Sequence, residues 1–318
     1  MLATDPLLYL TREDVRALLP PIHAQLDIVE ATYRSMARGE VELPPKPGVH
    51  PRKDCFIHAM PAYLREPDVS AIKWISGYPP NPALGLPYIS GLIVLNDSST
   101  GLPIAIMDAA EITAARTAAA SGVCIRAFAP SGWSRAAILG CGEQGRFHLE
   151  VLRALNPDVE VRAFDPVGER ARALVGDGAA EDPLTAVAGV DIVVTAGPIV
   201  EDASPVLAPS TLTERALVLP IDFDFYVQPE TVLAAAAFSV DDAAQYRYYR
   251  DEQGFFDGWP DPHATAGDWL EQRAAGQNLD VAGRIVCCNL GVATLDAAFA
   301  HAVAACARET GVGTDLPR

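Results

Sequence analysis

The feature that most constrains the fold of this chain is a glycine-rich loop that directly follows a short apolar run. Residues 136–139 are apolar, Gly140, Gly142 and Gly145 follow in a G-x-G-x-x-G pattern, and a helix-like pattern begins after them. A strand, a tight glycine turn and a helix N-terminus can together bind a dinucleotide pyrophosphate, because the first helical turn offers unpaired N–H groups. The predicted cofactor contacts in this loop are Gly140, Gly142, Glu143, Gln144 and Gly145.

The residues after the loop support the same interpretation. Residues 159–164 alternate in hydrophobicity like a second strand, and Asp165 follows that strand directly. An acid at this position accepts hydrogen bonds from the ribose hydroxyls of NAD and repels the 2′-phosphate of NADP. We therefore expect NAD, and NADP stays open because Arg170 lies nearby in the sequence. The remaining predicted cofactor contacts, at the end of a later strand, are Thr195 and Ala196.

The overall composition indicates which partners to exclude and in which cellular compartment to expect the protein. The 318 residues carry a formal net charge of −17, which argues against nucleic acid or an anionic membrane as a partner. No apolar stretch approaches the length of a membrane-spanning helix, and the N-terminus lacks the pattern of a secretory signal. The six cysteines show neither C-x-x-C nor Cys/His metal spacing. We expect a cytoplasmic protein with reduced cysteines and no bound metal.

The pattern of elements divides the chain into two domains, for which its length is sufficient. Before the loop we expect helix up to about residue 40 after a short extended start, then strands, then a long helix capped by Asp108. After it, strands alternate with helices, which is typical of a parallel, doubly wound sheet. The predicted strands cover residues 56–63, 70–76, 88–95, 102–107, 136–139, 159–164, 191–196, 216–221, 236–240 and 284–288.

We therefore predict an α/β fold in which a Rossmann-type doubly wound parallel sheet is joined to an α+β domain. The Rossmann domain is expected over residues 129–290. The α+β domain is expected over residues 1–128 and 291–318, since the alanine-rich helix after Gly291 lies beyond the last strand and should return to the first part of the chain.

Two basic residues in apolar surroundings are candidates for chemistry. Lys73 lies in a predicted strand between apolar neighbours, where burial would lower its pKa and let it exchange protons near neutrality. The alternative is a solvated lysine on an edge strand. Arg116 lies among alanines and threonines, and burying its charge requires an anion such as a substrate carboxylate. The alternative for Arg116 is a salt bridge within the chain.

These segments carry a resemblance that extends over nearly the whole chain. The most specific block is Ile112-Thr113 to Arg116-Thr117-Ala118-Ala119-Ala120-Ser121, and its combination with Gly140-x-Gly142-x-Gln144 is much more specific than either alone. Further matching segments are Met60-Pro61-Ala62-Tyr63, Ile72-Lys73, Leu95-Asn96-Asp97, Thr100-Gly101, Met107-Asp108, Leu290-Gly291, Asp296 and Gly311-Val312-Gly313-Thr314. Because these segments occur along the chain in the same order as in the family, the chain resembles the ornithine cyclodeaminase/μ-crystallin family.

The resemblance implies a division of labour between the domains. It implies that the first domain binds substrate and forms a homodimer, that the second binds a nicotinamide cofactor, and that the terminal helix completes the first. It also implies that Lys73 is the active-site lysine and that Arg116 binds a substrate carboxylate. Arg52 matches a second carboxylate-binding arginine, with Lys53 or a surface role as competing interpretations.

The chain departs from the family after the predicted strand at 216–221. The cyclodeaminases carry Asp-x-Pro-Gly-Lys in this segment, whereas here Asp222 and Asp224 are present and Pro-Gly-Lys is absent. Both acids lie at the carboxyl end of a strand, where open α/β sheets bind ligands, and strand alternation would point them the same way. Asp222 is the first choice for the functional acid and Asp224 the second. His58 could also enter the substrate site, although a structural role with satisfied hydrogen bonds is the preferred interpretation.

We expect an NAD(P)-dependent oxidoreductase that interconverts a small α-amino acid and its α-imino acid. In this hypothesis Lys73 and Asp222 are catalytic, and Arg52, Arg116 and Asp224 bind substrate. Imine reduction or amino-acid dehydrogenation is preferred because the cyclodeaminase segment is altered. The alternatives are cyclodeamination with internal NAD recycling, an enzyme that forms or splits a secondary amine, and a non-catalytic nucleotide-dependent binding protein.

Overall fold

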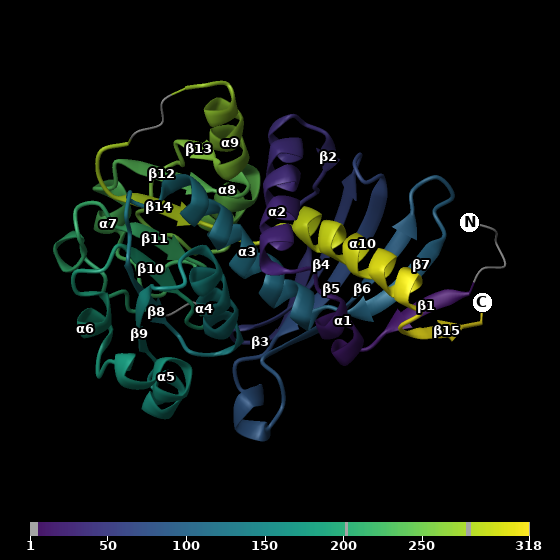
Figure 1. The fold of residues 1–318 in the computed structure, drawn as a ribbon, viewed down its shortest axis with the longest axis horizontal. Coiled ribbons are helices and arrows are strands. Elements are labelled where there is room, and N and C mark those ends of the chain that lie inside the picture. The colour runs from purple at the N-terminus through teal and green to yellow at the C-terminus, as the bar shows by residue number, and fades with distance from the viewer. Residues whose placement is uncertain (1–5, 201–202, 278–280, 318) are drawn as a thin grey trace. The chain divides into compact units, whose positions relative to one another are not determined.

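The computed structural model describes residues 6–200, 203–277 and 281–317 and divides the chain into two compact units, each built on one sheet (Figure 1). One unit comprises Met1–Arg116 with Gly291–Arg318, and the other comprises Thr117–Leu290. The division falls inside helix α3 (Ala110–Phe128), so this helix contributes to both units. Among the described residues, no helix has the length and apolar character needed to cross a membrane.

The first unit contains an eight-stranded sheet in the order β15-β1-β7-β6-β5-β4-β2, with β3 paired to β4. Neighbouring strands are antiparallel except β1 and β7, which are parallel. The strands are β1 (Leu7–Leu10), β2 (Val41–Glu42), β3 (Gly48–Arg52), β4 (Cys55–Leu64), β5 (Val69–Gly77), β6 (Ile89–Asp97), β7 (Pro103–Asp108) and β15 (Thr314–Leu316). The helices that lie wholly in this unit are α1 (Arg12–Leu18), α2 (Ile22–Ala37), the 3-10 helix η1 (Asn81–Leu84) and α10 (Ala293–Thr310).

Helix α10 covers one face of this sheet. It contacts β4, β5 and β6 and packs against α2. Along β5 the residues on one side, among them Ala71, Lys73 and Ile75, are buried, while Ile72 and Trp74 on the other side are exposed. The sheet therefore has one covered face and one open face, as antiparallel sheets often do.

The predicted N-terminal helix is interrupted in the structure. Helix α1 begins with a capping box, in which Thr11 and Asp14 exchange side-chain-to-backbone hydrogen bonds. The expectation of helix up to about residue 40 is wrong at Pro20 and Pro21, which separate α1 from α2 since proline cannot continue a helix. The predicted cap of α3 is confirmed, because the Ala110 N–H donates to Asp108 Oδ1 at 2.9 Å.

The second unit contains a seven-stranded, all-parallel sheet in the order β13-β12-β14-β11-β10-β8-β9, which confirms the predicted Rossmann-type fold. The strands are β8 (Arg135–Leu139), β9 (Glu160–Phe164), β10 (Ile192–Thr195), β11 (Leu217–Pro220), β12 (Ala237–Val240), β13 (Ala264–Thr265) and β14 (Ile285–Cys288). The helices are α4 (Glu143–Leu155), α5 (Gly168–Val175), α6 (Pro183–Val187), α7 (Pro229–Leu233), α8 (Ala243–Glu252) and α9 (Ala266–Ala274), with the 3-10 helices η2 (Gly176–Gly178) and η3 (Pro209–Thr211).

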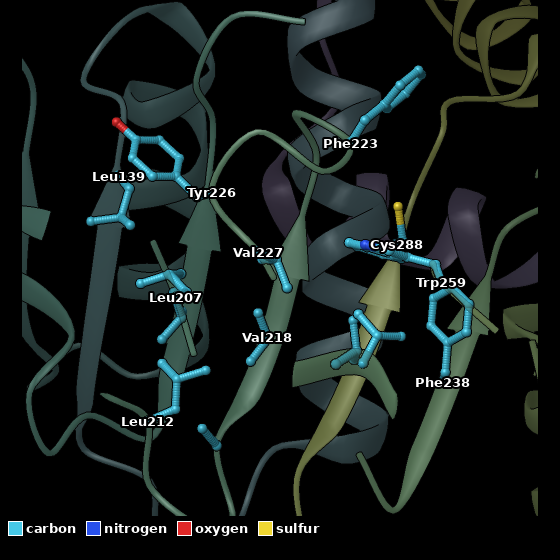
Figure 2. Packing of buried hydrophobic residues seen from close by; sticks show 14 of the residues in the cluster. Leu139, Leu207, Leu212, Val218, Phe223, Tyr226, Val227, Phe238, Trp259 and Cys288 are labelled. Carbon is cyan, nitrogen blue, oxygen red and sulfur yellow. The ribbon is translucent and has the colours of Figure 1, made fainter. Parts of the chain in front are cut away.

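This parallel sheet is buried on both faces. In β8, Ala137 and Leu139 belong to one apolar cluster, whereas Ala136 and Ile138 belong to another. Figure 2 shows the first cluster, where Tyr226 lies beside Leu139. Since both faces are covered, the ends of the strands are the places where a ligand can meet the sheet.

Candidate active site

The glycine loop after β8 requires glycine at two positions. Gly140 has φ +103°, and a Cβ atom there would lie 2.2 Å from the carbonyl oxygen of Ala196. A Cβ atom on Gly145 would lie 2.3 Å from the carbonyl oxygen of Gly140. A side chain at Gly140 would therefore push the loop away from the segment that follows β10. A side chain at Gly145 would push the start of α4 away from the loop.

The N-terminus of α4 fits a phosphate group. Gly142 is the N-cap residue and supplies no side-chain cap to the helix. Among the described residues, and apart from Gly142 and its two chain neighbours, no heavy atom lies within 4 Å of the position that a Cβ atom on Gly142 would occupy, so the loop is open on that side. In the first turn, the Oε1 atom of Gln144 is buried and has no hydrogen-bond partner among the described residues. An open glycine loop, a helix N-terminus and an unpaired amide oxygen suit a dinucleotide.

Asp165 connects the end of β9 to this loop. Its Oδ2 accepts a hydrogen bond from the Cys141 N–H, and its Oδ1 accepts one from the Val167 N–H, both at 2.9 Å. The exposed guanidinium of Arg170 lies 3.8 Å from Oδ1. The carboxylate is therefore fixed beside the loop, as a ribose-binding acid requires.

Asp222 is buried just beyond the end of β11. It accepts a short hydrogen bond from the Thr195 hydroxyl and a 2.7 Å hydrogen bond from the Gly197 N–H. Burial raises the pKa of Asp222 to about 7, and the hydrogen bonds oppose this only in part. Thr195 itself is buried, and the Ala196 N–H donates to the Leu139 carbonyl at 2.6 Å, which ties this segment to the glycine loop. An acid that titrates near neutrality can hold or release a proton here.

Asp224 does not share the environment of Asp222. Its Oδ2 accepts a 2.7 Å hydrogen bond from the Phe256 N–H. Strand β11 ends at Pro220, and Phe223 has φ +64°, so the expected strand alternation does not continue to Asp224. The expectation that both acids point the same way is therefore wrong, and the contact of Asp224 supports a loop.

In the first unit Lys73 is 1% exposed and forms an ion pair with Asp296, with 2.7 Å between Nζ and Oδ2. Its Nζ also donates to the Thr113 hydroxyl at 3.2 Å. Burial lowers the pKa of Lys73 to about 7; Asp296 opposes this shift, while Arg116 and Lys46 add to it. The alternative of a solvated edge lysine is wrong, because β5 is an inner strand and the side chain is buried.

Arg116 binds the other oxygen of the same carboxylate, with 3.1 Å between Nε and Asp296 Oδ1. Arg116 therefore forms the salt bridge within the chain that was the alternative interpretation, and its partner is an acid on α10. Gly291 lies against the guanidinium: its φ is +85°, and a Cβ atom there would lie 2.5 Å from Arg116 Nη1. Sequence reasoning did not assign Asp296 to the site, although the resemblance included it.

The structure places Lys46, and not Arg52, beside these groups. Arg52 is exposed, and its Nη1 donates to the Pro51 carbonyl at 2.8 Å. Lys46 is 8% exposed, its Nζ lies 3.5 Å from the Gly291 carbonyl, and its charge helps to lower the pKa of Lys73. The sequence signal that could have identified Lys46 is a lysine flanked in the sequence by Pro44, Pro45 and Pro47.

This chain is similar over nearly its whole length to known proteins, two of which were solved with a nicotinamide cofactor. It is 36% identical to the nodulation efficiency protein NfeD of Rhizobium meliloti, over 97% of this chain and 98% of that protein. A Δ1-pyrroline-2-carboxylate reductase of Thermococcus litoralis, solved with NADH and L-proline, is 26% identical, with a TM-score of 0.83 over 98% of this chain and 100% of that one. An archaeal alanine dehydrogenase, solved as a dimer with bound NAD, is 28% identical, with a TM-score of 0.84 over 98% of each chain.

The names of these two solved enzymes agree with the predicted oxidoreductase class. The family match itself is to the ornithine cyclodeaminase/mu-crystallin family and covers residues 8–308. It confirms the resemblance inferred from the arginine block and the glycine loop. This chain belongs to the ornithine cyclodeaminase/mu-crystallin family.

Proposed function

We propose that this protein is an NAD(P)-dependent oxidoreductase that interconverts a small α-amino acid and its α-imino acid. The observation that carries the proposal is the buried cluster of Lys73, Arg116 and Asp296, in which one carboxylate orients two cations. A buried arginine and a lysine with a pKa of about 7 suit a substrate that has both a carboxylate and a titrating nitrogen.

Each residue has a specific role in this proposal. Arg116, with Lys46 in the place first assigned to Arg52, binds the α-carboxylate. Lys73 transfers a proton at the substrate nitrogen or activates a water molecule, and Asp222 pairs with the charged amine or iminium. Asp224 supports the loop that contains Phe256. The cofactor, bound by Gly140, Gly142, Glu143, Gln144, Gly145, Asp165, Thr195 and Ala196, supplies or accepts the hydride.

A substrate screen tests this function. NADH absorbance is followed with α-keto acids plus ammonia or amines, and NAD⁺ reduction is followed with α-amino acids, for the wild type and for Lys73→Ala. Turnover that depends on Lys73 supports the proposal. Dinucleotide binding without turnover of any member of the panel would instead favour a nucleotide-dependent binding protein, and release of ammonia without net cofactor change would favour a cyclodeaminase.

NAD is the proposed cofactor, and Asp165 is proposed to select it. Asp165→Ser should shift the ratio of kcat/KM for NADH over NADPH toward NADPH by about tenfold or more, because serine does not repel a 2′-phosphate and Arg170 remains to attract it. Steady-state kinetics with both cofactors measures this ratio. Asp158→Ser, which changes an exposed acid of the same unit, should leave it unaltered. If Asp165→Ser keeps the wild-type preference for NADH, Asp165 does not select the cofactor.

We further propose that the protein forms a homodimer through the open face of the first unit's sheet. Ile72, Trp74 and Leu92 are 36%, 51% and 45% exposed on that face, and Trp74 pairs with Leu92 across β5 and β6. A contiguous apolar face of this kind is typical of a subunit interface. Trp74→Asp should halve the mass measured by light scattering, whereas Leu84→Asp, at a residue 72% exposed in η1, should not. A wild-type monomer would contradict the proposal.

A further inference from the structure

His58 lies on the same face of the sheet as Lys73. In the pairing of β4 with β5, Met60 is opposite Lys73 and His58 is opposite Ile75. Because side chains alternate along a strand, His58, Met60, Lys73 and Ile75 all point to the face that α10 covers. His58 is partly buried there, one diagonal position from Lys73.

Two glycines on the flanking strands make room for the ring of His58 and for its neighbour Phe56. A Cβ atom on Gly48 of β3 would lie 2.2 Å from His58 Cδ2, and one on Gly77 of β5 would lie 2.4 Å from Phe56 Cε1. The two rings stack with centroids 4.4 Å apart and planes 19° apart. The orientation of the imidazole is therefore defined by packing.

The imidazole has no protein partner to explain its position. Neither ring nitrogen of His58 has a hydrogen-bond partner in the part of the chain that the structure describes, and its only recorded ring contacts are with Phe56 and His50. Within the described residues, the protein itself does not supply the hydrogen bonds that the preferred structural role would require. A polar side chain that is held in place and unpartnered is available to a ligand.

The electrostatic surroundings of His58 select the charge of that ligand. Burial, followed by the charges of Lys46, His50 and Lys73, lowers the pKa of His58 to about 3, so the ring is neutral. These three groups come from the segment before β3, from β3 and from β5. The acid that pairs with Lys73, Asp296 of α10, also binds Arg116. A neutral N–H donor in a positive field attracts an anion and repels an ammonium group.

We propose that the side chain of the substrate ends in a carboxylate and that His58 is the residue that binds it. This inference rests on the proposed function and narrows its substrate class to dicarboxylic amino or imino acids. It disfavours diamino acids, whose terminal ammonium group would enter the same positive field.

Binding of two keto acids with equal carbon number tests the inference independently of turnover. The full-length protein, saturated with NAD⁺ so that no reduction occurs, is titrated calorimetrically with 2-oxoglutarate and with 2-oxopentanoate. The wild type should bind 2-oxoglutarate about tenfold more tightly or better, since a hydrogen bond to a charged group is lost in the other ligand. In His58→Gln this ratio should fall to about threefold or less, and in His58→Glu it should invert in favour of 2-oxopentanoate.

The controls separate this inference from the proposed function. His23→Gln changes an exposed imidazole on α2 of the same unit and should keep the wild-type ratio. A ratio near one in the wild type, or an unchanged ratio in a folded His58→Gln variant, would overturn the inference. Reduction of 2-oxopentanoate with ammonia as efficiently as of 2-oxoglutarate would also overturn it while leaving the proposed function intact. Selective binding of 2-oxoglutarate without reduction of either keto acid would support the inference and contradict the proposed function.

Discussion

Lys73→Ala should lower kcat by about 10²–10⁴-fold, which is the range that a positioned acid or base contributes. The variant retains Arg116 on Asp296, so the buried carboxylate is not left without a cation. We therefore expect it to fold and to bind NADH as the wild type does, which thermal melting and NADH fluorescence measure. A kcat within about threefold of the wild type, with both controls normal, would show that Lys73 takes no part in proton transfer.

The pH dependence of the two reaction directions gives a second readout of the same group. Imine reduction needs the protonated lysine as a donor, so its rate should fall as the pH rises through about 7. Oxidation of the amino acid needs the neutral amine as an acceptor, so its rate should rise over the same range. Asp222 has a pKa of about 7 as well, and Lys73→Arg separates the two groups because arginine keeps the charge without titrating. Any change of rate with pH that remains in Lys73→Arg is due to Asp222.

The Rossmann half could be predicted in detail because its signals are local. The strand, the turn and the helix around Gly140 and Gly145 follow one another in the sequence, and each glycine meets a steric requirement that only glycine satisfies. Asp165 follows its strand directly and is found beside the loop as expected. The same local logic failed at Asp224, because it assumed that strand geometry continues beyond Pro220.

The substrate half could be predicted only in part because its partners are distant in the sequence. Lys73 and Arg116 were recognised as cations in apolar surroundings, but their shared carboxylate, Asp296, lies 180 residues beyond Arg116 on a helix that completes the unit. The sequence pattern indicates that a buried charge needs a partner, but it does not indicate which acid is that partner. Similarly, the family match favoured Arg52, with Lys53 as the competing cation, whereas the fold buries Lys46 and leaves Arg52 exposed.

Arg116→Ala should raise KM for a carboxylate substrate and lower kcat/KM by about 10²–10³-fold, because removing one partner of a buried charge pair costs about 2–5 kcal/mol. Lys73 still pairs with Asp296 in this variant, so a fold comparable to the wild type is expected. Arg116→Lys should recover only part of the loss, since a point charge replaces a planar fork that can bind both Asp296 and a second carboxylate.

A matched control for this substitution is Arg34→Ala, which removes an arginine paired with Glu30 at 2.8 Å on α2 of the same unit. It should leave kcat/KM within about twofold, because such i,i+4 pairs contribute only about 0.3–0.5 kcal/mol and Arg34 is outside the cluster around Asp296. If Arg116→Ala matched Arg34→Ala in its kinetics, Arg116 would be a structural partner of Asp296 alone. The carboxylate-binding role would then fall to Lys46, and Lys46→Ala would be the variant that raises KM.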